Sequence, residues 1–164
     1  MLRRSAVFAL AMLLVLATAP GAIAKPHGTD RPITVDVSGE INWTFDPIPG
    51  CAVQTVSDAR GQATHLGRMT MHSVHCPPMG PGEVYHNGTM TLTAANGDAL
   101  TGTYDINGEP PYSFDIDGGT GRFSGATGRL ALSYEITWAP WDEVNNVPIA
   151  PWSANWHYSG TISY

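Results

Sequence analysis

Apolar and polar residues alternate along most of the chain after residue 32, and this period of two constrains the fold more than any other feature. In LALSYEITW, residues 130–138, leucine, tyrosine, isoleucine and tryptophan take every second position, with small or polar residues between them. Segments 89–93, 100–106, 112–116 and 156–164 follow the same pattern. A period of two rich in threonine and aromatic residues is typical of strands with one buried face.

The alternating segments predict an all-β fold. We expect strands near 33–37, 40–45, 52–57, 62–74, 84–94, 99–107, 111–117, 129–138 and 155–163. Asn96-Gly97, between two of these segments, predicts a hairpin turn because Asn-Gly tolerates positive φ. Such short strands build a barrel or a sandwich. One apolar face per strand favours a single antiparallel up-and-down β-barrel of about eight strands, with that face turned inward.

The first 24 residues are typical of a secretory signal peptide. Arg3 and Arg4 precede an apolar stretch from Ala6 to Ala17, and an A-x-A sequence ends at Ala24. We expect cleavage there, which leaves residues 25–164 as one β-barrel domain exported to the periplasm or the medium. No integral membrane span is expected after cleavage, because the apolar stretch is short. An uncleaved N-terminal anchor is the alternative.

Charge argues against nucleic acid as a partner. The whole chain has fourteen acidic and eight basic residues, and two of the basic ones lie in the leader, so the mature chain has a formal charge of −8. Such a surface repels phosphate backbones and anionic lipid. The sequence leaves the oligomeric state open.

The chain has two cysteines, Cys51 and Cys76. In an exported protein, a cysteine pair is first interpreted as a disulfide. A metal or redox pair is the alternative, but the C-x-x-C spacing of such sites is missing. We therefore expect one disulfide.

The glycine-rich stretch GGTGRFSGATG, residues 118–128, raises the question of a phosphate-binding loop. A dinucleotide fingerprint needs a third glycine at a fixed spacing and a following helix, and a P-loop needs a lysine after its last glycine. Neither condition is met, because an alternating segment follows and Lys25 is the only lysine. The glycines are better explained as turn residues, with Phe123 closing one end of a core and Arg122 outside.

This stretch, with ATHLGRMT at 63–70 and ANGDALTGTY at 95–104, resembles small bacterial secreted proteins with an allene-oxide-cyclase-like barrel, a dirigent or calycin-type fold. The resemblance covers roughly residues 62–136 and implies a fold rather than a reaction. It implies no catalytic residue, because the motifs of the plant enzymes have no counterpart here. A lipocalin is the alternative, although its G-x-W start is not reproduced by Gly39 and Trp43.

The inward set of the predicted strands includes candidate cavity residues: Tyr104, Tyr134, Trp156 and Tyr158. They either line a ligand cavity or fill the barrel, since barrels of this size do both. Residues 138–156 hold four tryptophans and three prolines, and a loop of this length in a compact domain is typically functional. We expect Trp138, Trp141 and Trp152 to belong to a lid over one mouth, or to a packed cover without a ligand.

His65 and Glu83 are the candidate acid–base residues, with ordinary surface or capping roles as the alternative. In the segment 65–76, treated as one strand, His65, Met69, Met71, Ser73 and His75 share a face that suits copper. One strand does not make ligands converge, so we expect methionines in the core, no metal and no cofactor.

Three classes of function follow from these observations. The favoured hypothesis is an exported barrel that binds a small apolar ligand in or at its mouth. A cofactor-free cyclase or isomerase that uses the cavity as a template is the second hypothesis, which leaves open whether the protein is an enzyme. A structural or carbohydrate-binding module of the cell envelope is the third.

Overall fold

The computed structural model describes residues 28–144 and 147–164, so the predicted signal peptide lies outside the described residues. Within these ranges almost all regular structure is strand. The strands are β1 (Arg31–Thr44), β2 (Gln54–Ala63), β3 (Gly67–Cys76), β4 (His86–Ala94), β5 (Ala99–Asp105), β6 (Tyr112–Gly119), β7 (Thr127–Thr137), β8 (Trp141–Asp142), β9 (Val147–Pro148) and β10 (Trp152–Ser163). A single-turn 3₁₀ helix, η1 (Gly121–Phe123), precedes β7.

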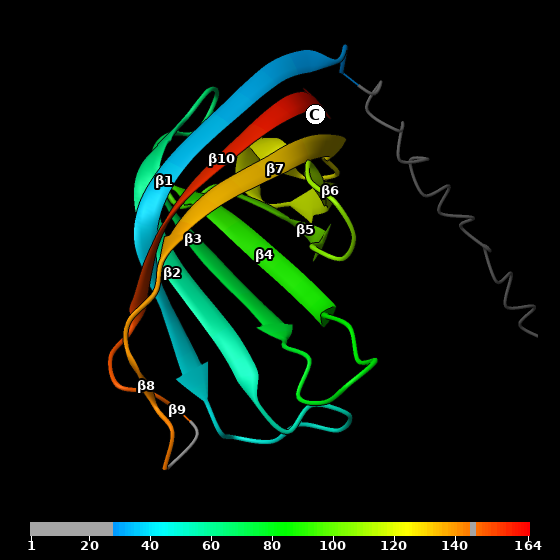
Figure 1. The fold of residues 1–164 in the computed structure, drawn as a ribbon. Helices are drawn as coiled ribbons and strands as arrows, with labels where there is room; N and C mark the ends of the chain where they lie inside the picture. Colours follow the sequence, from blue (N-terminus) through cyan, green and yellow to red (C-terminus); the bar gives the residue numbers. More distant parts are fainter. Residues whose placement is uncertain (1–27, 145–146) are drawn as a thin grey trace, which may run out of the picture.

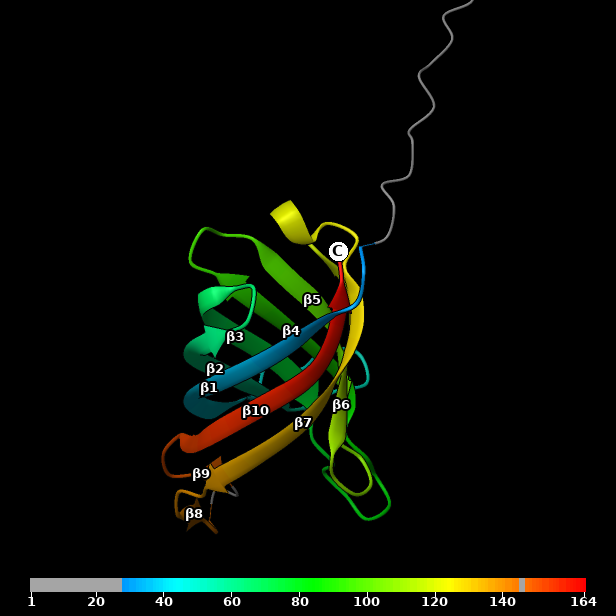
Figure 2. The ribbon, with the colours of Figure 1, turned by 90° about the horizontal axis from the view of Figure 1, so that it is seen from above.

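Eight strands close into a barrel in the order β1-β10-β7-β6-β5-β4-β3-β2, which confirms the predicted antiparallel up-and-down barrel. Each of the first seven strands pairs with its neighbour in sequence, and β10 closes the barrel between β7 and β1 (Figure 2). The short strands β8 and β9 form a separate hairpin between β7 and β10. The barrel therefore uses local pairings everywhere except at this closing strand.

The two ends of the barrel differ. At one end, which we call the mouth, the connections are long: 45–53, 77–85, 106–111 and 138–151. At the other, which we call the closed end, they are shorter: 64–66, 95–98 and 120–126. In Figure 1 the C-terminus and the start of β1 lie at the closed end, and the β8–β9 hairpin lies at the mouth.

The alternating pattern places one side-chain set of each strand inside. Of the inward residues expected from the pattern, Leu100, Leu132, Tyr158 and Ile162 are buried, and Tyr104 and Tyr134 are half-buried against the same core. Their neighbours Thr103, Ser133, Glu135 and Thr161 are exposed, and Thr101 is half-buried. The inward direction of the apolar set is the physical basis of the barrel, because side chains on a strand alternate strictly.

The glycine-rich stretch closes one end of the core, as its sequence predicts. Gly121 and Gly125 have φ of +59° and +76°, which glycine adopts without strain. The turn between them carries Phe123, which is fully buried and packs edge-on against Tyr164 at 4.9 Å between ring centroids.

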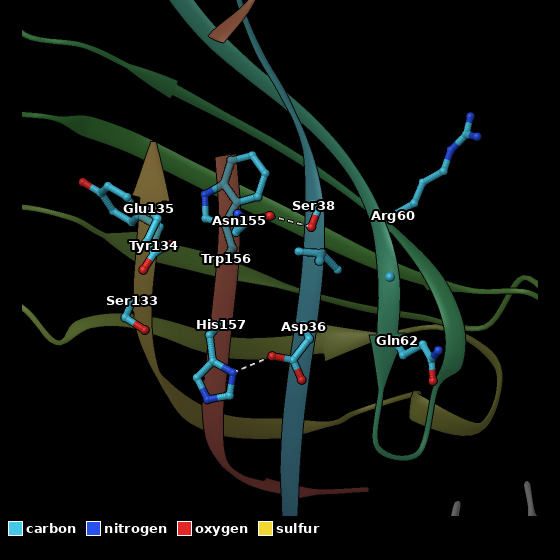
Figure 3. A pocket seen from close by; sticks show the side chains of 12 residues that line it. Asp36, Ser38, Arg60, Gln62, Ser133, Tyr134, Glu135, Asn155, Trp156 and His157 are labelled. Carbon is cyan, nitrogen blue, oxygen red and sulfur yellow. Dashed lines mark hydrogen bonds and ion pairs between the residues drawn. The ribbon is translucent and has the colours of Figure 1, made fainter. Parts of the chain in front are cut away.

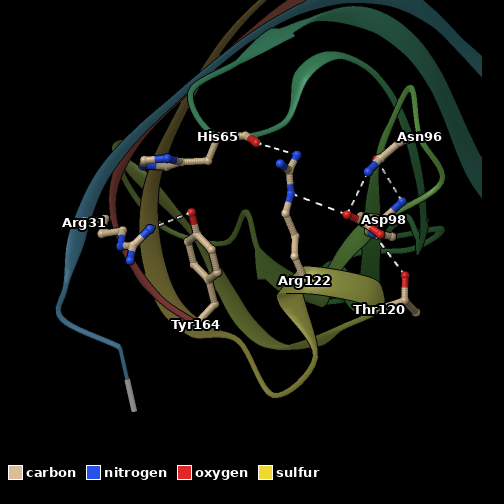
Figure 4. Close-up of polar contacts among 8 residues, drawn as sticks. Arg31, His65, Asn96, Asp98, Thr120, Arg122 and Tyr164 are labelled. Carbon is tan, nitrogen blue, oxygen red and sulfur yellow. Dashed lines mark hydrogen bonds and ion pairs between the residues drawn. The ribbon is translucent and has the colours of Figure 1, made fainter. Parts of the chain in front are cut away.

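Polar contacts hold this closing turn on the barrel (Figure 4). Arg122, an exposed residue, donates from Nη2 to the carbonyl oxygen of His65 at 2.7 Å, and its Nε lies 3.4 Å from Asp98 Oδ2. The Thr120 hydroxyl accepts from the backbone N–H of Ala99 at 3.0 Å. Arg122 thus ties all three connections of the closed end together, since His65, Asp98 and Arg122 come from different ones.

Two strand predictions were wrong in their boundaries. The expected strands 33–37 and 40–45 form one continuous strand, β1. The expected strand 62–74 is divided between β2 and β3 by a turn in which His65 has a φ of +70°. His65 therefore does not share a strand face with Met69 and His75, because it lies at the closed end, before β3 begins.

The predicted disulfide between Cys51 and Cys76 is confirmed. It joins the mouth loop 45–53 to the last residue of β3, and such a bond is consistent with an oxidising location. No helix among residues 28–144 and 147–164 is long and apolar enough to cross a membrane.

Candidate functional site

The mouth half of the barrel contains a cavity of about 170 Å³. Inward side chains from β1, β2, β3, β5, β7 and β10 line it, together with residues of the mouth loop 77–85. Most of its lining is aromatic or aliphatic. Because the closed end is packed around Phe123, the mouth is the direct way into this cavity.

All four side chains predicted to face a ligand cavity line this one: Tyr104, Tyr134, Trp156 and Tyr158. Of the predicted lid residues, Trp138 and Trp152 line it as well. Trp141 belongs to β8 and packs against the cluster from outside. The structure therefore brings these residues together at one place, and their role toward a ligand stays a prediction.

A tryptophan cluster forms one side of the mouth. Trp152 packs edge-on against Trp43 at 5.4 Å and against Trp138 at 4.4 Å between ring centroids. Trp141 contacts Trp43 edge-on at 5.8 Å. These contacts bring Trp141 and Trp152 against Trp43 of β1, and Trp138 remains 62 % exposed at the rim. Edge-to-face packing holds the indoles in fixed positions around the opening.

The most polar part of the cavity is a contact between His75 on β3 and Tyr104 on β5. His75 Nδ1 lies 2.5 Å from Tyr104 Oη, although β4 separates the two strands. Gly88 of β4 makes this contact possible. A Cβ at Gly88 would lie 3.3 Å from the Tyr104 ring and 2.4 Å from the Tyr104 carbonyl oxygen, so the phenol ring lies over a glycine.

Burial sets the protonation of this pair. It lowers the pKa of His75 to about 4, so the imidazole is neutral at physiological pH. It also raises the pKa of Tyr104 well above the usual value, and a hydrogen bond from Ser73 opposes this rise only in part. We assign the Tyr104 hydroxyl as the donor to His75 Nδ1, which places the imidazole proton on Nε2.

Tyr134 stands on the other side of the cavity, stacked on Tyr112 at 5.5 Å between ring centroids. Burial, with a smaller contribution from Tyr112, raises the pKa of Tyr134 to about 12. Tyr104 and Tyr134 therefore stay protonated over the whole physiological pH range, and they offer hydroxyl groups rather than phenolates.

Tyr158 forms the floor of the cavity. Its hydroxyl donates toward the sulfur atoms of Met71 and Met90, at 3.2 and 3.3 Å. Burial raises the pKa of Tyr158 far above its usual value. Met69 and Met71 are buried core residues, so the methionines of β3 pack the barrel interior.

The two candidate acid–base residues lie outside the cavity. His65 is at the closed end, where its Nε2 lies 3.0 Å from the carbonyl oxygen of Pro32. Glu83 lies in the mouth loop 77–85, and its Oε2 accepts a hydrogen bond from the backbone N–H of Met79 at 2.7 Å. Neither side chain is part of the cavity lining.

Sequence reasoning did not assign four polar residues to the cavity lining: Thr55, Ser57, Ser73 and His75. It placed Ser73 and His75 on one face with the core methionines, but considered that face only as a copper site. The alternation of β3 places Ser73 and His75 on its inward face and could have indicated them. The inward face of β2 gives no such signal, because it is built from small and polar residues while Val56 points the other way.

A larger hollow lies on the outer surface and is open to solvent (Figure 3). It measures about 710 Å³ and spans β2, β1, β10 and β7. Four of its side chains form two hydrogen-bonded pairs, Ser38–Asn155 at 2.6 Å and Asp36–His157 at 2.7 Å. Because this hollow is more open and its lining less apolar, we place the candidate site in the smaller, more enclosed cavity.

Within the part of the chain that the structure describes, no group of three or more His, Cys, Asp or Glu side chains could hold a metal ion. Comparison of the chain with protein families, curated proteins and solved structures finds no match in any of the three.

Proposed function

We propose that the protein binds a small apolar molecule in the mouth of its barrel. The observation that carries this proposal is the partly enclosed cavity of about 170 Å³ lined largely by aromatic and aliphatic side chains. Apolar cavities with a few placed polar groups are the usual form of small-molecule sites.

The construction of the cavity supports binding over mere packing. The closed half of the same barrel is filled by side chains such as Phe114, Leu92 and Leu130, all with essentially no exposed surface. The sequence could have continued this filling toward the mouth. Instead, small residues such as Ser57 and Ser73 occupy inward positions there and leave space. That space lies next to the tryptophan cluster, whose rings offer apolar contact to an entering molecule.

The test is a titration with toluene, followed by tryptophan fluorescence and by the thermal midpoint of unfolding. We expect saturable binding, because Trp43, Trp152 and Trp156 line the cavity. We also expect a rise in the midpoint, because a ligand that binds only the folded state stabilises it.

A matched pair of variants locates the binding. Ser57→Leu adds volume inside the cavity, and Ser133→Leu adds the same group on the outer face of β7. We expect Ser57→Leu to weaken toluene binding by at least about tenfold and Ser133→Leu to leave it unchanged. Absence of saturable binding, or equal binding by both variants, refutes the proposal.

The proposal includes export and a family affiliation. The Cys51–Cys76 disulfide supports export, since such bonds persist in oxidising compartments. The closed eight-stranded barrel and its plug at Phe123 support an affiliation with allene-oxide-cyclase-like barrels. Mass measurement of secreted material tests the first point, because export with cleavage after Ala24 yields a chain that begins at Lys25.

One observation favours a second function, cofactor-free isomerisation. A neutral imidazole, His75, lies at the cavity and accepts a hydrogen bond from Tyr104 at Nδ1. The pair can relay a proton: the phenol oxygen takes one from a bound molecule as its own proton passes to Nδ1, and Nε2–H returns one at a second position. Proton exchange at the α-carbon of a ketone in D₂O tests this function. His75→Gln should abolish exchange that exceeds the buffer rate, and wild-type exchange at the buffer rate excludes the function for that ketone.

A further inference from the structure

The interior of the mouth half has a polar wall. Thr55 and Ser57 lie on the inward face of β2, and Ser73 and His75 lie on the inward face of β3. The strand register pairs Thr55 with His75 and Ser57 with Ser73, so the four side chains form a compact block across two neighbouring strands. Polar groups are therefore concentrated on one side of the cavity.

The opposite wall is mainly apolar. Around the eight-stranded barrel, β7 lies four strands away from β3, which places the two strands on opposite sides. Leu132 and Ile136 of β7 line the cavity there, and Trp156 of β10 lies beside them. A molecule that fills the cavity consequently meets hydroxyl and imidazole groups on the β2–β3 side and, on the β7 side, hydrocarbon together with the phenol of Tyr134.

Three buried polar atoms of the lining have no hydrogen-bond partner among residues 28–144 and 147–164: Trp43 Nε1, Trp152 Nε1 and Thr55 Oγ1. Their side chains are neighbours. Trp43 faces Thr55 in the β1–β2 register, and Trp43 and Trp152 pack edge-on. Buried polar groups nearly always have a hydrogen-bond partner, so we expect this cluster to find one in a bound molecule. An indole N–H can only donate, and the missing partner is therefore an acceptor.

The charge around the cavity indicates that this acceptor is neutral. The described lining residues include no arginine, lysine, aspartate or glutamate, and His75 is neutral in the folded protein. In sequence the four mouth loops hold five carboxylates and no lysine or arginine, and Asp105 ends β5 next to one of them; the loop carboxylates are Asp46, Glu83, Glu109, Asp142 and Glu143. A rim of this charge repels an anion, and nothing in the described lining compensates a buried carboxylate.

We infer that the occupant is a small, neutral carbonyl compound, a ketone or an ester with an apolar body. Thr55 Oγ1 and the two indole N–H groups have essentially no exposed surface in this structure, so the ligand oxygen reaches them through a small shift of these side chains. The hydrocarbon part of the ligand lies against β7. The size agrees with one ring, because about 170 Å³ corresponds to roughly six water volumes. This inference rests on the proposed binding function and adds the chemical class of the ligand.

Acetophenone and cumene test the inference, because they have the same number of non-hydrogen atoms and differ in the carbonyl group. Each is titrated into ¹⁵N-labelled protein while the indole N–H signals are observed, with Trp43→Phe and Trp152→Phe assigning the two signals. We expect acetophenone to move at least one of these two signals downfield, as hydrogen bonding to an oxygen does, and cumene to leave both near their original positions.

Variants measure the contribution of Thr55. Thr55→Val removes the hydroxyl and keeps the side-chain shape, and Thr161→Val on the outer face of β10 is the control. We expect Thr55→Val to weaken acetophenone binding about tenfold while cumene binding stays within about twofold, because only the ketone loses a partner. Thr161→Val should change neither. The indole signals of the wild-type protein give the same test without any variant.

The outcomes separate the two proposals. If both compounds bind but neither indole signal responds to the ketone and Thr55→Val affects both compounds equally, the carbonyl inference is overturned and the binding function stands. If benzoate binds more tightly than acetophenone, the neutral charge is overturned. If none of the three compounds binds, the binding function itself fails.

Discussion

The closed half and the mouth half of the barrel are built from the same eight strands, yet one is solid and the other holds a cavity. In the closed half, Leu100, Leu130 and Phe123 interlock without exposed surface. In the mouth half, the same alternation brings serine, threonine and histidine inward beside tryptophan and tyrosine. Strand pattern thus determines the barrel, whereas side-chain volume determines where it is hollow.

The surfaces of the two ends also differ: the mouth exposes apolar side chains, and the closed end exposes polar ones. Among the described residues, every large apolar side chain that is exposed lies in a mouth loop: Phe45, Ile48, Met79, Val84, Tyr85, Trp138, Trp141, Val144 and Ile149. The closed end carries instead a polar network around Arg122. An apolar rim around an apolar cavity is typical of a binding surface, because isolated domains rarely expose so much hydrocarbon in one region.

Opening the solid half should have the largest effect. Phe123→Ala removes a fully buried ring from the closing turn, and we expect the free energy of unfolding to fall by about 3–5 kcal/mol in urea titrations. Phe45→Ala is the matched control at the mouth, where the ring is 54 % exposed, and we expect a loss of at most about 0.5 kcal/mol. Equal losses in the two variants would contradict the distinction between the halves.

The mouth depends on a covalent tie that the closed end does not have. Replacing both Cys51 and Cys76 by alanine removes a bond between residues 25 positions apart, and we expect a loss of about 3 kcal/mol through the greater entropy of the unfolded chain. Denaturation of the oxidised wild-type protein and the double variant at one pH measures this. A loss below about 1 kcal/mol would mean that the mouth loops hold their places by packing alone.

The mouth half should also be the acid-sensitive half, because it contains His75. In the folded protein the pKa of His75 is lowered from 6.5 to about 4, so between these values the unfolded chain binds a proton that the folded chain does not. The free energy of unfolding should therefore fall as pH decreases through this window and level off below it. We expect a contribution of about 2 kcal/mol, allowing for partial access of water to the ring.

His75→Gln isolates this effect. The difference between the wild-type and variant stability curves should vary between pH 6.5 and 4 and be flat at higher pH, because other titrating groups, including His86 with its raised pKa, contribute equally to both proteins. A difference curve that is flat across the whole window would show that the imidazole is as solvated when folded as when unfolded.

The smallest effect is expected at the turn of the closed end. Gly125 has a φ of +76° with open space around its Cα, so Gly125→Val introduces backbone strain without a clash. We expect a loss of about 1–2 kcal/mol in urea unfolding, with unchanged toluene binding at the mouth. Gly125→Asn is the control, because asparagine tolerates this conformation, and it should lose about half as much or less. Loss of toluene binding without loss of stability would indicate that the glycine-rich stretch itself contributes to a ligand site.

Much of the fold could be predicted from local patterns. The alternating segments and the Asn96-Gly97 turn indicate strands and a hairpin, because backbone geometry fixes the side-chain period within each strand. The boundaries around β2 and β3 could not be found in this way. The turn between them contains His65 at positive φ, a conformation that cannot be predicted from a histidine in the sequence.

The candidate site was predicted in part. Tyr104, Tyr134, Trp156 and Tyr158 belong to inward faces that the alternation identifies, and they line the cavity. The candidates His65 and Glu83 were chosen by residue type, and the structure places both outside the cavity lining. Thr55 and Ser57 could not be chosen, because small polar residues on a weakly patterned strand look the same whether they face inward or outward.

The sequence by itself determined the strand content, the inward set of most strands, the cysteine pair and the turn that carries Phe123, since each of these depends on neighbours in the chain or on residue chemistry. Tertiary structure alone decided that His75 meets Tyr104 across Gly88, and that three unpartnered polar atoms gather beside one cavity. The physical reason is barrel closure. It brings into contact side chains from strands that are distant in sequence, and it sets how much space their volumes leave between them.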